Sequence, residues 1–118
     1  MYIWNINKNI GILKKICENS NTIGKCNFSI SKNTCFINSI YIDKQYRNNY
    51  IGSNLLKKIE EYSKQNNINK INLIIHKEFL EKTEEFYIKN GYKNSNINNN
   101  NTYDGLKTYY LCKYSKNI

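Results

Sequence analysis

The feature that most constrains this chain is a change of hydrophobic period just after Asp43. From Tyr2 to Asp43, short apolar runs alternate with turn-forming clusters, a pattern typical of strands joined by hairpins. After Asp43, apolar side chains recur at spacings of three to four residues, which is the period of an amphipathic helix. The sequence therefore predicts an antiparallel meander followed by a strand-to-helix turn.

Each predicted element has its own stretch of sequence. The meander has four strands, at Tyr2 to Ile6, Ile10 to Glu18, Thr22 to Ser31 and Thr34 to Asp43. A helix runs from about Ile51 to Gln65, and the apolar run Lys70 to Ile75 predicts a strand that is covered on both faces. A strand, a helix and a strand in this order favour a parallel pair with a right-handed crossover.

The last third of the chain predicts a second helix and a final strand. The helix covers about Glu78 to Asn90, and Gly91 is placed to take the left-handed conformation that ends helices. The Tyr-rich segment Leu106 to Lys113 predicts a strand, and the Asn-rich residues Asn94 to Asn101 predict a loop before it. If the last strand lies at a sheet edge, we expect it to pair across the axis of a homodimer.

Length and polarity limit the class of protein. A chain of 118 residues is the size of one ordinary domain, so we expect a single domain over residues 1–118. The chain has no apolar run long enough to span a bilayer, and Lys8, Lys14 and Lys15 lie where a signal peptide has its apolar centre. These features predict a soluble, cytoplasmic protein without a membrane partner.

The formal charge of +9 raises the question of a nucleic-acid partner, because a basic face attracts phosphates. All the basic residues except Arg47 are lysines, and they are spread along the whole chain. No lysine cluster is interleaved with aromatic residues on one element. The charge is therefore more typical of a solvated surface than of a nucleic-acid site.

The cysteine pattern argues against a metal site. Cys17, Cys26, Cys35 and Cys112 form no CxxC pair, and His76 is the only histidine. The first three cysteines fall in predicted strands, where a reduced thiol behaves as a small buried apolar side chain. We expect no bound metal.

The segment from Ile40 to Leu56 carries the most chemical information, since a strand leads through a short polar turn into a helix. Backbone amides at a helix N-terminus have no intrahelical acceptor, and the helix dipole adds positive potential, so this geometry suits a pyrophosphate. Arg47 lies at the mouth of the turn, where its guanidinium could bind phosphate through two hydrogen bonds. From the residues alone, a surface cation at Arg47 and an ordinary turn at Gly52 are the favoured interpretation, because strand-to-helix turns are common and one Gly is weak evidence.

The same segment resembles the acetyl-coenzyme A motif of the GNAT N-acetyltransferases, in which a strand leads to Arg or Gln, two residues, Gly, one residue, and Gly or Ala. Arg47 and Gly52 match this pattern. Tyr50 stands where the family usually has its first Gly, and Asn48 replaces another residue that is frequently Gly. We expect the Tyr50 side chain to crowd the pyrophosphate or to resist a positive φ angle.

Two further segments support the resemblance. Phe86 to Tyr92 resembles the family's aromatic-Tyr signature with a Gly and an aromatic residue at the end of the next helix, and Thr22-Ile23-Gly24 resembles the strand beside the acceptor site. The two helices that family members usually insert between the first two strands are missing. The resemblance implies an α+β fold with a mixed, mostly antiparallel sheet of about six to seven strands, a splayed parallel pair in its middle and two main helices packed on it.

The resemblance also implies a function, which is direct transfer of acetyl from acetyl-CoA to a primary amine of a small molecule or protein. The residues that it implies for cofactor binding are Ile40, Tyr41, Ile42, Arg47, Asn48, Asn49, Tyr50, Ile51, Gly52 and Ser53. Tyr87 would be the general acid, with a role in helix packing as the alternative, and an amide of Tyr41 or Ile42 would stabilise the oxyanion. Glu18, Asp43, His76, Glu78, Asp104 and a water relay all stay open as the general base.

Two other function classes stay open beside the acetyltransferase. The first is a GNAT-like module that binds coenzyme A or a protein without catalysis, which the Tyr50 departure motivates. The second is a basic nucleic-acid-binding domain. Thermal stabilisation by acetyl-CoA and salt-sensitive retention of RNA would distinguish these classes.

Overall fold

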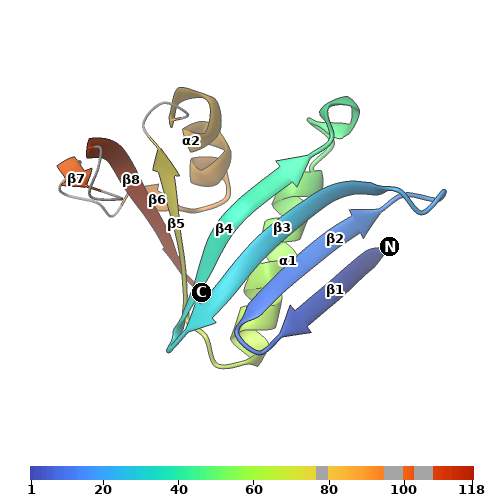
Figure 1. Ribbon diagram of the computed structural model, residues 1–118, viewed down its shortest axis with the longest axis horizontal. Helices are drawn as coiled ribbons and strands as arrows, with labels where there is room; N and C mark the ends of the chain where they lie inside the picture. Colours follow the sequence, from blue (N-terminus) through green and yellow to red (C-terminus); the bar gives the residue numbers. More distant parts are fainter. Residues whose placement is uncertain (77–79, 95–99, 103–107) are drawn as a thin grey trace. The chain divides into compact units, whose positions relative to one another are not determined.

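The computed structural model describes the backbone of residues 1–76, 80–94, 100–102 and 108–118, and the side chains of residues 1–73, 83–93 and 116–118 (Figure 1). The chain divides into two compact units, Met1–Ile71 with Ile118 and Asn72–Asn117. Among the described residues, no helix is long and apolar enough to cross a membrane.

The first unit begins with four strands that pair in succession. They are β1 (Tyr2–Asn7), β2 (Ile10–Ile16), β3 (Thr22–Ser31) and β4 (Thr34–Ile42), and each neighbouring pair is antiparallel. Two-residue turns join β1 to β2 and β3 to β4, with Lys8 at φ 57° and Lys32 at φ 55°. Such left-handed turn residues match the twist of a tight hairpin. The predicted meander is confirmed.

Two bulges interrupt the regular pairing. In β4, Asn27 faces Ser39 while Phe28 faces Ile37, so that Asn38 is the extra residue. In β3, a second register shift leaves Ile23 as the extra residue opposite the end of β2. A bulge bends its strand and re-aims the residues that follow. The bulge at Asn38 therefore sets the direction of the last residues of β4.

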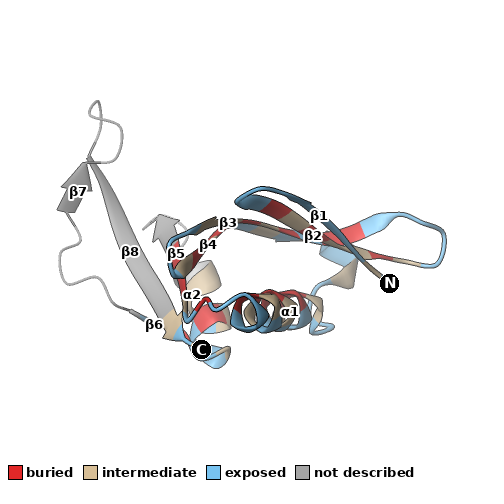
Figure 2. Ribbon diagram, turned by 90° about the horizontal axis from the view of Figure 1, so that it is seen from below, coloured by how far each residue is buried: buried red, intermediate tan, exposed pale blue. Residues whose placement is uncertain are grey.

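Helix α1 (Ile51–Gln65) covers one face of these strands (Figure 2). Residues that face each other across an antiparallel pair share one side of the sheet, and the side that carries Leu13, Cys26 and Phe28 is the buried one. The helix adds its own apolar stripe to this core, through Leu55, Leu56 and Ile59. The helix bounds agree with the prediction because this stripe has an unbroken helical period.

The second unit contains the rest of the secondary structure. Its elements are the last five residues of β5 (Lys70–His76), α2 (Leu80–Lys89), β6 (Lys93–Asn94), β7 (Asn100–Thr102) and β8 (Thr108–Asn117). Strand β8 is antiparallel to β6 and β7, and it lies between β5 and β6 in the strand order. The last strand therefore has neighbours on both sides and does not offer the free edge that the homodimer expectation required.

The second unit agrees with the sequence in outline and differs in detail. Ile71, Asn72 and Leu73 are consecutive and buried, which confirms a strand covered on both faces. The predicted helix start at Glu78 lies outside the described residues. Part of the Asn-rich segment is a strand, because the backbone of Asn100 and Asn101 pairs with Tyr110 and Tyr109, and such pairing does not depend on the side chains. With β6 and β7 included, the described residues contain eight strands.

Candidate active site

The end of β4 positions the first residues of the candidate site. Ile40, Tyr41 and Ile42 follow the Asn38 bulge and face Cys26, Lys25 and Gly24 across the strand pair. The Asp43 amide donates a hydrogen bond to the Ile23 carbonyl of β3 at 2.9 Å. Because backbone groups alternate along a strand, the Tyr41 amide also faces β3, whereas the amide and carbonyl of Ile42 face away from it.

A single turn of 3₁₀ helix, η1 (Lys44–Tyr46), follows the strand. Its closing hydrogen bond runs from the Tyr46 amide to the Asp43 carbonyl, at 2.8 Å. The sequence predicts only a polar turn here, so this helical turn is an addition that the folded chain reveals. The extra helical turn compacts the connection, so that the chain reverses at the end of β4 and enters α1 within a few residues.

Arg47 ties the turn back to the strand. Its Nε donates a hydrogen bond to the Ile42 carbonyl at 2.9 Å, and its guanidinium carbon lies 5.9 Å from the centre of the Tyr41 ring. In the part of the chain that the structure describes, no acceptor contacts its terminal NH₂ groups. Arg47 can therefore hold the turn with one nitrogen and offer the other two to an anion.

The residues between Arg47 and α1 adopt the backbone conformation that glycine prefers. Asn48 has φ 67°, and Tyr50, the N-cap of α1, has φ 63° and ψ 11°. Asn tolerates this left-handed region, whereas a residue such as Tyr pays about 1–2 kcal/mol there. The expected resistance of Tyr50 to a positive φ does not prevent the conformation. Its side chain is 76% exposed.

The first turn of α1 carries unused amides. The first helical hydrogen bond runs from the Asn54 amide to the Tyr50 carbonyl at 2.9 Å, so Ile51, Gly52 and Ser53 have no acceptor within the helix. No side chain caps this end, and the first turn holds no acidic residue. Asn49 and Tyr50 before it are exposed. These amides, together with the helix dipole and Arg47, can bind an anion.

Gly24 lets the start of α1 approach the sheet closely. A Cβ at this position would lie 2.9 Å from Ile42 Cδ1 and 3.1 Å from Ile51 Cγ2. Such distances are too short for a side chain without a shift of its neighbours. The Thr22-Ile23-Gly24 segment therefore helps to position the helix that carries the unused amides.

Tyr87 belongs to the second unit, near the end of α2. Its side chain is 7% exposed, and its ring packs edge to face against Tyr92, with ring centres 5.8 Å apart. The Tyr92 amide donates to the Tyr87 carbonyl at 3.0 Å, and the Gly91 amide donates to the Ile88 carbonyl at 3.0 Å. With Gly91 at φ 91°, these bonds form a Schellman motif, which confirms the predicted helix end.

Only some of the candidate general bases lie among the described residues. Glu18 is exposed and Asp43 is half-buried at the start of η1, and neither has a hydrogen-bonded side-chain partner among the described residues. The side chains of His76, Glu78 and Asp104 lie outside the described residues. In the described part of the chain, no three metal-ligating side chains gather at one place.

The cysteines divide into two groups. Cys26 and Cys35 are fully buried, and burial raises the pKa of the Cys26 thiol to about 12 and that of Cys35 to about 11. Both stay protonated near neutral pH and act as core side chains, as predicted. Cys17 lies just beyond the end of β2 and is half-exposed, because the strand ends at Ile16 rather than at Glu18.

The sequence analysis missed a polar pair beside the end of β4. Asn27 Nδ2 donates to Ser39 Oγ at 3.0 Å, and among the described residues no partner contacts the buried Asn27 Oδ1. The pair lies on the side of the strands that also carries Tyr41, away from α1. Polar residues at alternate positions of two apolar strands were the signal that could have found it.

A strand, a turn and a helix whose first amides are unused follow the meander, and the comparisons with known proteins identify the family that has this fold. The family model described as "Acetyltransferase (GNAT) family" matches residues 3–92. The chain therefore belongs to the GNAT acetyltransferase family. No curated protein sequence matches it.

Solved structures of this family share the fold. The PaiA N-acetyltransferase of Thermoplasma acidophilum, solved with coenzyme A, is 23% identical with a TM-score of 0.78, over 93% of this chain and 62% of its own. A Bacillus anthracis protein assigned as a streptothricin acetyltransferase, solved with acetyl coenzyme A, is 21% identical with a TM-score of 0.83, over 95% and 64%. A GNAT acetyltransferase of Staphylococcus aureus is 24% identical with a TM-score of 0.74, over 92% and 67%.

These matches confirm the predicted fold class, a GNAT-like mixed sheet with two main helices. The chain spans about two thirds of the length of these relatives. In this chain β1 connects directly to β2 through Lys8 and Asn9, without a helix between them. This agrees with the predicted lack of helices between the first two strands.

Proposed function

We propose that this protein is an acetyl-CoA-dependent N-acetyltransferase that transfers acetyl directly to a primary amine of a small molecule or protein. The observation that carries the proposal is the row of unused amides at Ile51, Gly52 and Ser53, beside the terminal nitrogens of Arg47. A pyrophosphate needs several donors and positive potential at one place, and this turn supplies both. Family membership and neighbours solved with coenzyme A or acetyl coenzyme A support the same ligand.

The rest of the cofactor would lie along the end of β4. The backbone groups of Ile42 face away from β3, and those of Ile40 follow the same alternation, so these groups rather than those of Tyr41 would bond the amides of the pantetheine arm. The Arg47 bond to the Ile42 carbonyl joins the two parts of this binding surface. Asn48, Asn49 and Tyr50 complete the turn that follows.

In the proposed reaction, the amine nitrogen bonds to the thioester carbonyl carbon, the amine loses a proton to a base, and the carbon–sulfur bond breaks. The developing oxyanion needs a backbone donor, and the orientation of the strand favours the Ile42 amide over that of Tyr41. Tyr87 would protonate the departing thiolate. A water molecule that relays the proton to bulk solvent serves as the base in this scheme, and the reaction needs no cysteine nucleophile.

A paired binding and turnover experiment tests the proposal. Calorimetric titration with acetyl-CoA should show binding, whereas pantetheine, which lacks the pyrophosphate, should bind at least about tenfold more weakly. Adding a panel of primary amines should then release free thiol and give an acetylated amine that mass spectrometry identifies. Binding without thiol release would favour the non-catalytic module, and salt-sensitive retention of RNA without acetyl-CoA binding would favour the nucleic-acid reading.

A further inference from the structure

Strand β1 has an unpaired outer edge whose exposed backbone groups can be identified. Among the described strands, β1 pairs with β2 alone. The Ile16 amide donates to the Met1 carbonyl at 2.9 Å, and backbone groups alternate along the strand. The groups of Ile3, Asn5 and Asn7 therefore point to β2. Those of Tyr2, Trp4 and Ile6 point outward.

This edge lacks the features that normally prevent strands from associating. The six residues of β1 include no proline and no charged side chain, although charged residues make up 23% of the chain. Ile3 is 44% exposed, and Trp4 and Ile6 are each 38% exposed. A neutral, apolar and unprotected edge strand is a template for pairing with another strand.

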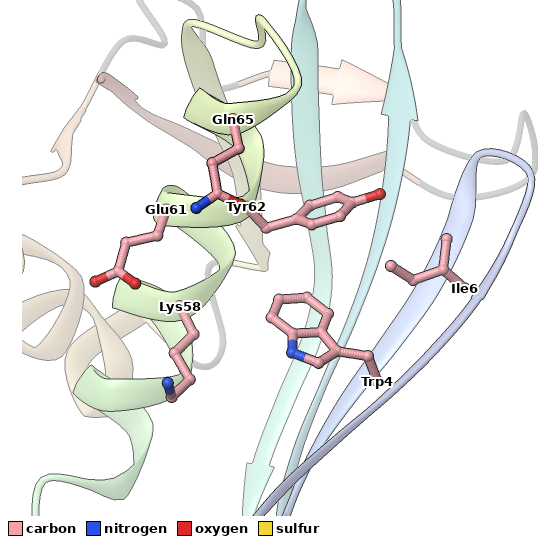
Figure 3. A pocket seen from close by; sticks show the side chains of 6 residues that line it. All are labelled: Trp4, Ile6, Lys58, Glu61, Tyr62 and Gln65. Atoms are coloured by element: carbon pink, nitrogen blue, oxygen red, sulfur yellow. The ribbon is translucent and has the colours of Figure 1, made fainter.

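An open hollow lies beside the same edge, on the side that faces α1. It has a volume of about 370 Å³, and its lining is shown in Figure 3: Trp4 and Ile6 from β1, and Lys58, Glu61, Tyr62 and Gln65 from α1. The Trp4 ring lies over Tyr62, with ring centres 5.2 Å apart. Aromatic side chains thus stand partly uncovered at the edge where backbone groups are also free.

We propose that a second copy of this chain pairs its β1 with this edge, antiparallel and centred on Trp4. The outward residues are spaced evenly about Trp4, so a twofold axis at this residue places Tyr2 opposite the second copy's Ile6 and Trp4 opposite its own counterpart. Each such pair exchanges both of its outward backbone hydrogen bonds. A closed, self-complementary interface of this kind gives a dimer rather than a fibre.

The side chains agree with this register. Residues opposite each other share a face, so both copies turn Tyr2, Trp4 and Ile6 toward the α1 side, where the hollows meet. Lys58 Nζ lies 4.5 Å from the centre of the Tyr2 ring, whereas Glu61 lies about one helical turn further along α1. Because Trp4 on the axis packs on Tyr62, the antiparallel arrangement brings the Lys58 end of one helix level with the Gln65 end of the other.

The register predicts a charge-specific effect at Ile6. In the dimer this residue faces the second copy's Tyr2, whose ring has Lys15 Nζ at 4.6 Å and Lys58 Nζ at 4.5 Å. Ile6→Lys adds a further cation there, and Ile6→Glu adds an anion. Both variants lose the same apolar side chain, so we expect the dimer dissociation constant of Ile6→Lys to exceed that of Ile6→Glu at least about tenfold.

Two measurements on the full chain test the proposal. Sedimentation velocity over a concentration series should show a monomer–dimer equilibrium, and emission from Trp4, the only tryptophan, should shift to shorter wavelength with the same midpoint. Ile10→Lys is the matched control, since Ile10 is 65% exposed on β2 and contributes nothing to the outer edge. That variant should dimerise like the unaltered chain.

Three results would overturn the proposal: a monomer at every concentration, a dimer whose Trp4 emission does not change, or equal dissociation constants for Ile6→Lys and Ile6→Glu. A folded Ile6→Lys monomer, verified by circular dichroism, is the expected result. None of these outcomes depends on binding of acetyl-CoA, so the dimer and the proposed activity are tested separately.

Discussion

The start of α1 and the end of α2 use the same backbone conformation with opposite residue choices. At the end of α2 the left-handed position is filled by Gly91, at φ 91°. At the start of α1 it is filled by Tyr50, at φ 63°, where the GNAT pattern has glycine. The comparison shows that this turn adopts the left-handed conformation without a glycine at that position.

The reason lies in the contacts around each position. The turn before α1 is held on both sides, by the Asp43 amide on the Ile23 carbonyl and by Arg47 on the Ile42 carbonyl. These contacts do not involve the Tyr50 side chain, which projects into solvent. At the end of α2, Lys116 Nζ donates to the Asn90 carbonyl and lies close to Gly91, so that position is more crowded.

The largest expected effect is on turnover and concerns the side chain at the end of α2. Tyr87→Phe keeps the ring contacts with Tyr92 and Phe86 and removes only the hydroxyl. We expect thiol release to fall about 100-fold, because a general acid contributes at least that much. Tyr92→Phe removes a hydroxyl from the neighbouring ring and should leave turnover unchanged. Unchanged turnover in Tyr87→Phe would limit Tyr87 to a packing role.

The next effect is on stability. Gly91→Ala places a Cβ at a residue with φ 91° and 3.1 Å from Lys116 Cε. We therefore expect the free energy of unfolding, measured in urea titrations, to fall by about 1–2 kcal/mol. Gly91→Asn should cost less, since Asn tolerates left-handed conformations. If Gly91→Ala left the free energy of unfolding unchanged, the end of α2 would tolerate a residue other than glycine as the turn before α1 does. The two helix ends would then not differ in this respect.

A smaller effect concerns the cation in the turn. Arg47→Ala removes both the bond to the Ile42 carbonyl and the charge, so we expect the dissociation constant of acetyl-CoA to rise about tenfold in calorimetry. Lys44→Ala is the matched control, because it removes an exposed cation from the same turn without that bond, and it should change affinity by less than about threefold. Equal effects would mean that Arg47 acts only through its charge.

The smallest effect is expected at Tyr50. Tyr50→Gly relieves the left-handed strain but adds chain entropy to the unfolded state, so stability should rise by less than about 1 kcal/mol. Because the ring is exposed, the acetyl-CoA dissociation constant should stay within about threefold. An affinity gain of tenfold or more would show that the tyrosine obstructs the turn.

The sequence predicted the parts of this structure that depend on local patterns. The strands of the meander follow from alternation and turn residues, the bounds of α1 follow from its apolar stripe, and the end of α2 follows from Gly91. The bulge at Asn38 could not be predicted, because it depends on how β4 registers against β3. For the same reason, the residues of β1 whose backbone groups point away from β2 can be identified only once the pairing of the two strands is known.

The candidate site likewise has features that the sequence predicts and features that only the folded structure shows. Arg47 and the helix start at Ile51 could be identified from residue type and position. The Arg47 bond to the Ile42 carbonyl and the 3₁₀ turn between them required the folded backbone. The positive φ at Tyr50 could not be predicted from its residue type, because tyrosine disfavours this conformation. The contacts that maintain it come from other parts of the turn.

The central claim is that the turn with Tyr50 still binds a pyrophosphate through backbone amides. Nuclear magnetic resonance of the ¹⁵N-labelled chain, titrated with coenzyme A and separately with pantetheine, tests it most directly. We expect the amide signals of Ile51, Gly52 and Ser53 to shift on addition of coenzyme A and to stay in place with pantetheine. Amide signals that do not move with coenzyme A, or that move equally with both ligands, would contradict it.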